Sequence, residues 1–301
     1  MNNFLIVLLG STGVGKTDIS IDLAGHLRCE IISADSRQFY RELKIGAAVP
    51  SENQLNAVKH HFIGFLSAED YYSASIYERD VLNLLAELFK RNRIALMAGG
   101  SGLYIDSVCN GIDDIPDVDP AIRQKYLNKL KDEGIGSLRI ALKVLDPGYY
   151  AKTDLRNQKR IVRALEICET TGRPYSSFLT GQKRKRDFEI LKIGLERPRE
   201  ELYHRINLRV DKMIADGLEE EAGNLFRFRH LNALNSVGYK ELFDYFEGKT
   251  SREKAIELIK RNTRRFAKRQ MTWWSRDKEI QWFNPEKKTE IIDFIKSKVK
   301  D

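Results

Sequence analysis

The sequence predicts an α/β protein, in which a parallel sheet is covered by helices on both faces and carries a helical insertion domain. Three observations support this prediction. Short apolar runs alternate with longer helical stretches, a pattern typical of parallel sheets. A glycine-rich segment directly follows the first apolar run. The alternation stops between residues 113 and 186, where only helices are expected.

Five short apolar segments are expected to form the strands: residues 4–9, 30–34, 94–98, 190–195 and 280–283. In a sheet of parallel strands the carboxyl ends meet at one edge, and ligands bind in the crevice beyond that edge. Gly10, Asp35 and residues 99–101 each follow an expected strand. We therefore expect these residues to line one crevice.

The first strand leads into a loop with the pattern G-x-x-x-x-G-K-T, and the next helix is expected over residues 18–27. Backbone N–H groups converge in such a P-loop, and the helix N-terminus adds partial positive charge, which suits a diphosphate or triphosphate. Lys16 would reach the outer phosphate oxygens, and the Thr17 hydroxyl would be a ligand of Mg²⁺. The expected phosphate-binding residues are Gly10, Ser11, Thr12, Gly13, Val14, Gly15, Lys16 and Thr17.

Asp35, after the second strand, is the first candidate for chemistry. A carboxylate there can bind Mg²⁺ through water, act as a general base, or cap the next turn. The third strand ends in Gly99-Gly100-Ser101, not in the metal-binding acid common in phosphate-loop ATPases, which argues against a motor or a switch. The glycine pair would permit close approach of a ligand, and Ser101 could hydrogen-bond it.

The segment without strands predicts the insertion domain. Helices are expected over residues 121–131, 136–144 and 157–170, and Gly172 and Pro174 end the last one. We place the insertion domain at residues 115–187 and the P-loop α/β core at residues 1–114 and 188–301.

Positive charge is concentrated in residues 252–276, which hold nine of the 51 Lys and Arg but only two of the 43 Asp and Glu; residues 183–186 are also all basic. On the expected helix, one half of the circumference carries Lys260, Arg261, Arg264, Arg265, Lys268 and Arg269. The opposite half carries Ile256, Ile259, Phe266, Ala267, Trp273 and Trp274. A solvated helix usually mixes both signs of charge, so this face favours a nucleic acid over solvent alone. A helix with Lys159, Arg160 and Arg163 adds to this reading.

The sequence shows no pattern typical of a membrane-spanning, secreted or metal-binding protein. The longest apolar run, residues 4–9, is too short to span a bilayer, and no signal-peptide pattern opens the chain. We expect a cytoplasmic protein with no membrane partner. The three cysteines lie far apart, and the five histidines form no metal-ligand pattern. The adjacent His60 and His61 are expected to be structural.

The chain resembles the isopentenyl-tRNA transferase family, the bacterial tRNA dimethylallyltransferases, almost from end to end. The resemblance rests on segments in a fixed order: the loop at 10–17, SADSRQFY at 33–40, GGSGLY at 99–104, KRIVRALE at 159–166, LYHRI at 202–206, VGYKEL at 237–242 and AKRQMTW at 267–273. The loop alone is generic, whereas the ordered set is specific.

The resemblance implies transfer of a dimethylallyl group from dimethylallyl diphosphate to N6 of the adenosine immediately 3′ of the tRNA anticodon. The P-loop would then hold the donor diphosphate with Mg²⁺ on Thr17, which fits the missing acid after the third strand. The resemblance makes Asp35 the general base and adds Ser101 and Arg205 to the catalytic residues. The adenosine would be flipped out of its stack to reach them.

The resemblance also implies that the insertion clasps the tRNA anticodon stem-loop, and we expect the protein to be a monomer. The tRNA-binding positions that it implies are Asp35, Ser36, Arg37, Gln38, Ser101, Arg123, Lys159, Arg160, Ile161, Val162, Arg163, Gly238 and Lys240. From the basic helix we add Arg264, Arg265 and Lys268.

Two positions depart from the family pattern. Ser101 stands where Thr is usual, which keeps the hydroxyl but constrains it less. Leu155-Arg156-Asn157 replaces the usual Pro-Asn-Asp, which bears on tRNA contact and not on the reaction.

Two other functions remain open from the residues alone. A small-molecule or nucleotide kinase would share the P-loop and a helical lid, but it leaves the basic helix unexplained. An RNA-binding protein could use a nucleotide only as a switch, but the absent second acid and the position of Asp35 speak against this.

Overall fold

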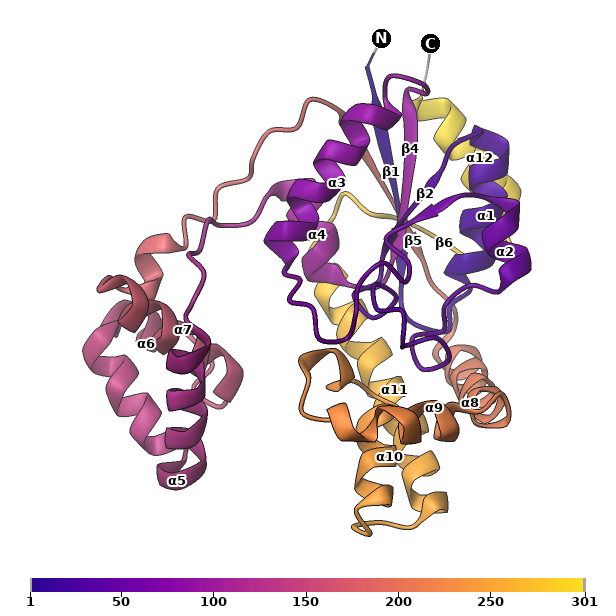
Figure 1. Ribbon diagram of the computed structural model, residues 1–301. Coiled ribbons are helices and arrows are strands. Elements are labelled where there is room, and N and C mark those ends of the chain that lie inside the picture. Colours follow the sequence, from indigo (N-terminus) through magenta and orange to yellow (C-terminus); the bar gives the residue numbers. More distant parts are fainter. Residues whose placement is uncertain (1, 300–301) are drawn as a thin grey trace. The chain divides into compact units, whose positions relative to one another are not determined.

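The computed structural model describes residues 2–299, which form two compact units (Figure 1). The larger unit contains the chain up to Asn110 and again from Lys185, and the smaller unit is Gly111–Arg184. The sequence predicted an insertion over residues 115–187. The smaller unit begins earlier than predicted, at Gly111. It also ends earlier, because Arg186 belongs to the larger unit, where it donates to the Ser107 carbonyl at 2.8 Å and pairs with Glu78 at 2.7 Å.

The larger unit is built on six strands in the order β3-β2-β4-β1-β5-β6, and every neighbouring pair is parallel. In chain order they are β1 Phe4–Gly10, β2 Ile31–Ala34, β3 His60–His61, β4 Ile94–Gly99, β5 Glu189–Leu195 and β6 Gln281–Phe283. The five predicted strands are confirmed. β3 was not predicted, because two residues are too few to show an apolar pattern. His61 Nε2 lies 2.5 Å from the carboxylate of Glu30 beside this edge strand, so the histidine is structural, as expected.

The helices of the larger unit are α1 Lys16–Leu27, α2 Glu52–Ala57, α3 Ala74–Leu88, α4 Gly102–Asn110, α8 Arg199–Ala215, α9 Leu218–Leu225, α10 Tyr239–Phe246, α11 Arg252–Trp274 and α12 Lys288–Lys298. Short 3₁₀ turns cover Phe226–Phe228 (η2) and Asn232–Leu234 (η3).

Side chains of β1 alternate between two apolar cores. Leu5, Val7 and Leu9 belong to a core that includes α3 and α4. Ile6 and Leu8 belong to another core that includes α1 and α12. Figure 1 shows these two pairs of helices on opposite sides of the sheet. Because both faces are covered, the strand is apolar at nearly every position, and the predicted α/β class is confirmed.

The smaller unit is helical, as predicted. It contains α5 Pro120–Leu145, α6 Pro147–Lys152, α7 Gln158–Thr171 and the 3₁₀ turn η1 Tyr175–Phe178. The two helices expected over 121–131 and 136–144 form one element that is interrupted at Gly134, whose φ of 77° is left-handed. Gly172, also left-handed, ends α7 as the sequence predicted. α6 was not predicted from the sequence.

The basic helix α11 differs from its prediction on one flank. Its fully buried side chains include Ile259, Ala267 and Trp274, but Phe266 is 39% exposed and Trp273 is 41% exposed. The prediction that these two aromatics face the core is therefore wrong. At about 100° per residue Trp273 has the same helical-wheel angle as the buried Ala255, and Phe266 lies between Ala255 and Ile259. The angle alone therefore does not separate exposed from buried positions here, and the neighbouring elements decide which side chains are covered.

Candidate active site

The P-loop joins β1 to α1 and bends through Gly13 (φ 81°) and Gly15 (φ 109°), both left-handed. A Cβ at Gly13 would lie 2.9 Å from Ile206 Cγ1 of α8, so a side chain there is excluded by space as well as by φ. Gly15 is the N-cap of α1, and no side chain caps that helix end. The first amides of α1 are therefore left to an anion, as the motif predicts.

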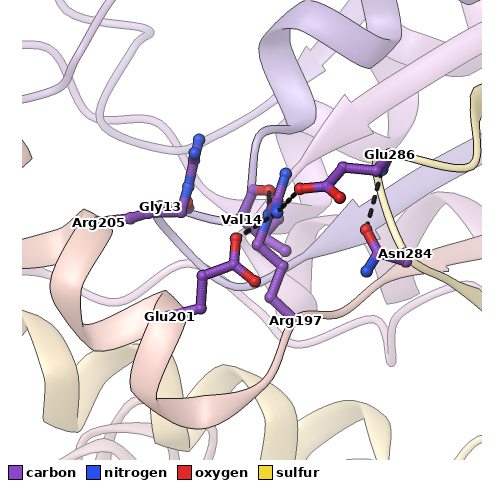
Figure 2. A network of polar contacts seen from close by, with 7 residues as sticks. All are labelled: Gly13, Val14, Arg197, Glu201, Arg205, Asn284 and Glu286. Carbon is purple, nitrogen blue, oxygen red and sulfur yellow. Dashed lines mark hydrogen bonds and ion pairs between the residues drawn. The ribbon is translucent and has the colours of Figure 1, made fainter.

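Two arginines at or near the start of α8 hydrogen-bond the loop (Figure 2). Arg205 Nε donates to the Gly13 carbonyl at 3.0 Å, and Arg197 Nε donates to the Val14 carbonyl at 3.0 Å. Arg197 also pairs with Glu201, and with Glu286 at 2.8 Å. These two bonds hold the Gly13 and Val14 carbonyls and so fix the shape of the loop. Arg205 was predicted from its motif, whereas Arg197 was not predicted.

Lys16 lies over the loop, where its Nζ donates to the Gly10 and Ser11 carbonyls at 2.8 and 2.9 Å. An ammonium has three N–H donors, so one remains for a phosphate oxygen. Desolvation lowers the pKa of Lys16 to about 8, although nearby Asp35 acts in the opposite direction and Arg209 lowers it further. The side chain is therefore a cation that is easily discharged above neutral pH.

A cleft of about 370 Å³ opens in front of the P-loop. Its walls come from the P-loop, the turn after β2, α8 and α11, and its lining residues are Thr12, Gly13, Gly15, Lys16, Thr17, Asp18, Asp35, Gln38, Ala48, Arg205, Leu208, Arg209, Phe266 and Gln270. Of the residues predicted to line one crevice, Asp35 does so beside the P-loop, whereas Gly10 and residues 99–101 are not among the lining residues.

Arg209 is a cleft residue that the sequence analysis missed. It follows Arg205 by one helical turn on α8, and burial lowers the pKa of its guanidinium while Asp35 opposes that shift. Arg205 and Arg209 lie on one face because residues i and i+4 are neighbours on a helix. This i, i+4 arginine pair was the signal in the sequence that could have identified it.

Asp35 follows β2 and is fixed by the turn that it begins. Its Oδ1 accepts the Arg37 N–H at 3.1 Å, and within residues 2–299 its Oδ2 has no hydrogen-bond partner. The Ser101 hydroxyl reaches the same turn, where it accepts the Ser36 N–H at 3.0 Å and lies 3.2 Å from Ser36 Oγ. The observed contacts of Ser101 therefore position the segment that carries Asp35.

The glycines after β4 make room for the protein itself. A Cβ at Gly99 would lie 2.2 Å from the Ala34 carbonyl oxygen, and one at Gly100 would lie 2.5 Å from Gln270 Nε2. The expectation that this pair lets a ligand approach is thus corrected: its space is taken by β2 and α11. Gln270 in turn accepts the Thr12 N–H at 2.9 Å and donates to the Gly100 carbonyl at 2.8 Å.

Oxygen donors for a cation lie at the mouth of the P-loop. Thr17, Asp18 and Asp35 all line the cleft. Mg²⁺ takes one or two protein oxygens and completes its shell with water and phosphate oxygens, so this donor set fits Mg²⁺ on a bound diphosphate. Among the described residues, no group of three or more His, Cys, Asp or Glu could hold a metal without such a ligand.

The residues predicted to contact tRNA from the core have different environments. Arg37 Nη1 donates to the Asn232 and Ala233 carbonyls at 3.0 and 2.9 Å, and Gln38 Nε2 donates to the Ala48 carbonyl at 3.1 Å. Both side chains therefore brace the site from within. Gly238 is the buried N-cap of α10, whereas Lys240 is exposed.

Two of the tRNA contacts predicted in the smaller unit are wrong as side-chain contacts. Ile161 and Val162 are 0% and 3% exposed in its apolar core. Lys159 and Arg160, the two residues immediately before them on α7, are exposed. A step of two residues turns a helix by about 200°, so these two pairs face opposite sides of α7.

Two predicted cations of the smaller unit share one buried acid. Arg123 Nη1 lies 3.2 Å from Glu166 Oε1, and Arg163 Nη1 lies 3.6 Å from Oε2 of the same fully buried carboxylate. They still expose 56% and 34% of their side chains, so both remain accessible.

On α11 the predicted cations divide into two groups. Arg264 donates to Asn207 at 2.6 Å, and Lys260 pairs with Asp211 at 2.5 Å, so this flank is tied to α8. Arg265 and Lys268 are exposed. No helix in the described part of the chain is long and apolar enough to cross a membrane.

Comparisons with known proteins agree with this geometry. A family model described as IPP transferase matches residues 38–277. The chain is 51% identical over 296 residues to tRNA dimethylallyltransferase 1 of Bacteroides fragilis, with 98% of each chain covered. It is 52% identical to a tRNA dimethylallyltransferase of Christiangramia forsetii, with 99% of each chain covered.

Two solved structures resemble the whole chain. The tRNA isopentenylpyrophosphate transferase of Bacillus halodurans matches with a TM-score of 0.71 at 35% identity, covering 98% of this chain and 96% of that one. A eukaryotic dimethylallyltransferase described as acting on tRNA matches with a TM-score of 0.80 at 25% identity, covering 98% of this chain and 80% of that one. The chain therefore belongs to the IPP transferase family.

Proposed function

We propose that this chain transfers a dimethylallyl group from dimethylallyl diphosphate to N6 of the adenosine immediately 3′ of a tRNA anticodon. The full-length similarity to proteins named tRNA dimethylallyltransferase supports this reaction. Within the molecule, the proposal rests on one observation: Asp35 lines the same cleft as Lys16, Arg205 and Arg209. A leaving diphosphate and a proton acceptor can thus be held side by side.

The donor diphosphate would lie on the P-loop. The amides at the start of α1 and the cations Lys16, Arg205 and Arg209 face the position where negative charge grows as the C–O bond breaks. Fixed positive groups in a desolvated cleft stabilise such charge without reorganising. The apolar walls at Ala48, Leu208 and Phe266 suit the five-carbon tail of the donor.

Mg²⁺ would be held by Thr17, with Asp18 or Asp35 reached through water. When bound, it would add positive charge at the diphosphate oxygens.

Asp35 would act as the general base. The N6 lone pair forms a bond to C1 of the dimethylallyl group, the C1–O bond breaks, and its electron pair leaves with diphosphate. The N6 proton passes to Asp35 Oδ2. The exocyclic amine is a poor nucleophile because its lone pair is delocalised into the ring, and general-base help of this kind contributes about 10²–10⁴-fold.

The tRNA side of the proposal divides between the two units. In the larger unit, Ser101 would keep the turn of Asp35 in place for the flipped base, and the exposed cations of α11 would contact phosphates. In the smaller unit, Lys159 and Arg160 would contact the anticodon stem, together with the exposed parts of Arg123 and Arg163. We propose that the enzyme works as a monomer, because every group named for the reaction comes from one chain.

The direct test offers labelled dimethylallyl diphosphate and ATP in parallel to the purified protein with Mg²⁺ and unmodified tRNA. Nucleosides are then analysed by mass spectrometry. We expect a dimethylallyl adduct on N6 of the adenosine 3′ of the anticodon, with no ATP consumed. Absence of the adduct together with ATP turnover would contradict the proposal and favour a kinase or a nucleotide switch.

The role of Asp35 is tested by a matched pair of variants. Asp35→Asn keeps the size and the acceptor for the Arg37 N–H but cannot take a proton, whereas Asp35→Ala removes both. We expect each variant to lose about 10²–10⁴-fold in transfer rate while tRNA affinity stays near that of the wild type. If Asp35→Asn keeps its activity, or if tRNA binding collapses in both variants, Asp35 is structural and not the base.

A further inference from the structure

Three side chains form an exposed stripe along α11, which we call the aromatic stripe: Phe266, Arg269 and Trp273. Their spacing of three and then four residues places them on one face of the helix. The Arg269 guanidinium lies 5.7 Å from the centre of the Phe266 ring. The stripe therefore presents two aromatic rings and one planar cation in a row.

Trp273 is held rigidly although it is 41% exposed. Its indole Nε1 donates to Asp106 Oδ2 at 2.8 Å. One side of the ring rests against Gly102, where a Cβ would come within 2.6 Å of the indole. The ring thus has a fixed orientation, and its remaining surface faces solvent. Phe266 is exposed on the same face of the helix, and a contiguous exposed apolar patch bordered by polar residues marks an interaction site.

The position of the stripe connects it with the proposed reaction. Phe266 lines the cleft that contains Asp35. At the other end of the stripe, Trp273 rests on the residue that follows Ser101. The stripe therefore leads away from the cleft along the start of α4, where the chain next to a flipped nucleotide would lie.

The charge around the stripe indicates the kind of partner. Residues 258–274 contain no acid, and the exposed Arg265 and Lys268 flank the aromatic side chains. A polyanion is favoured on such a surface, and aromatic rings beside cations are the usual means of binding unpaired nucleotides.

We propose that the aromatic stripe stacks unpaired bases of the tRNA anticodon loop that neighbour the target adenosine. This inference rests on the proposed function. Extruding one base removes a stacking partner from its neighbours, and an indole ring or a guanidinium over phenyl can replace the lost partner. Trp273 is the main platform, and the Arg269–Phe266 pair is the second.

The test measures binding of a labelled anticodon stem-loop RNA to the full chain, without donor. Alanine substitution of a stacking aromatic costs about 5- to 150-fold in affinity, and we expect Trp273→Ala to lose an amount in this range. Trp273→Phe should restore most of the affinity, whereas Trp273→Leu should not, because leucine replaces apolar area but has no π-face. The Phe and Leu variants can be compared directly, so the test does not depend on the alanine variant alone.

Two further measurements separate stacking from other roles. The slope of log affinity against log salt should stay unchanged in Trp273→Ala but fall by about 0.7–0.9 in Arg269→Gln, since only the second change removes a charge. An RNA duplex of equal length, with no unpaired bases, should bind Trp273→Ala as it binds the wild type. Phe294→Ala on α12 is the matched control, because Phe294 also lies near a cation, with Lys298 Nζ 5.8 Å from its ring.

Unchanged stem-loop affinity in Trp273→Ala would overturn the inference. Full rescue by leucine, or an equal loss for the duplex, would overturn it as well. If the wild type forms the N6 adduct while these results are negative, only the aromatic stripe is refuted. If the wild type neither binds the stem-loop nor transfers the group, the proposed function fails and the stripe proposal fails with it.

Discussion

The pKa of Lys16 leads to a prediction about how diphosphate binding depends on pH. Only the protonated side chain attracts the diphosphate, and desolvation places its pKa at about 8. Lys16 is then about nine-tenths charged at pH 7 and about one-tenth charged at pH 9. Because the positive charge is lost as pH rises through the pKa, affinity for inorganic diphosphate should fall by up to about tenfold between these two pH values, or about 1.4 kcal/mol.

Lys16→Arg is the matched control, because a guanidinium stays charged throughout this range. Ionisation of the ligand itself affects both proteins equally, so the difference between them isolates Lys16. Calorimetric titration of inorganic diphosphate, at constant ionic strength and Mg²⁺, gives both the affinity and the protons exchanged. We expect the wild type to take up close to one proton on binding at pH 9 and the arginine variant to take up fewer. Equal pH dependence in the two proteins would refute the reasoning, because it would mean that Lys16 stays charged over this pH range, as an ordinary lysine does.

Three further predictions concern the loop, the basic helix and the smaller unit. Gln270→Ala leaves the P-loop amide and the Gly100 carbonyl without their hydrogen-bond partner. The loss costs about 1–3 kcal/mol for each group that is fully buried, and less where water in the cleft replaces the bond. We expect a lower melting temperature and a raised KM for the donor. Arg265→Gln combined with Lys268→Gln should weaken tRNA binding and reduce its salt slope by about 1.4–1.8 in filter-binding assays. Burial raises the pKa of Glu166 despite its two arginine partners. On balance, the surroundings of Glu166 therefore disfavour its charged form. The melting temperature of Glu166→Gln should lie within a few degrees of that of the wild type near neutral pH, and above that of Glu166→Ala.

Thr272→Ala changes a side chain that is exposed on the same helix as Gln270, and an equal rise in donor KM in both variants would exclude a specific role for the glutamine. Lys296→Gln with Lys298→Gln removes two exposed charges from α12, and an equal change of salt slope would mean that α11 is an ordinary solvated surface. Glu166→Gln melting as low as Glu166→Ala would show that the buried charge stabilises the smaller unit.

The sequence predicted the layered core because its signals there are local. The apolar run from residues 4 to 9 is short, has no polar face and leads directly into a glycine-rich turn, which favours a strand covered on both sides. The spacing of Gly10, Gly15 and Lys16 defines a phosphate loop through backbone conformation alone. Asp35 was found for the same reason, since any residue directly after a parallel strand lies at the ligand edge of the sheet.

Only the tertiary structure decided which side chains meet. Arg197 and Arg209 are far from the P-loop in sequence, and their roles follow from the packing of α8 against it. Gln270 bridges the P-loop and the turn after β4, which no periodicity could indicate. Burial of Ile161, like the exposure of Trp273, depends on what packs beside each helix. Helical periodicity gives the direction of a side chain, whereas the partner that covers it comes from elsewhere in the chain. For this reason the sequence determined the loop and the sheet of this protein, and the tertiary structure determined the walls of its cleft.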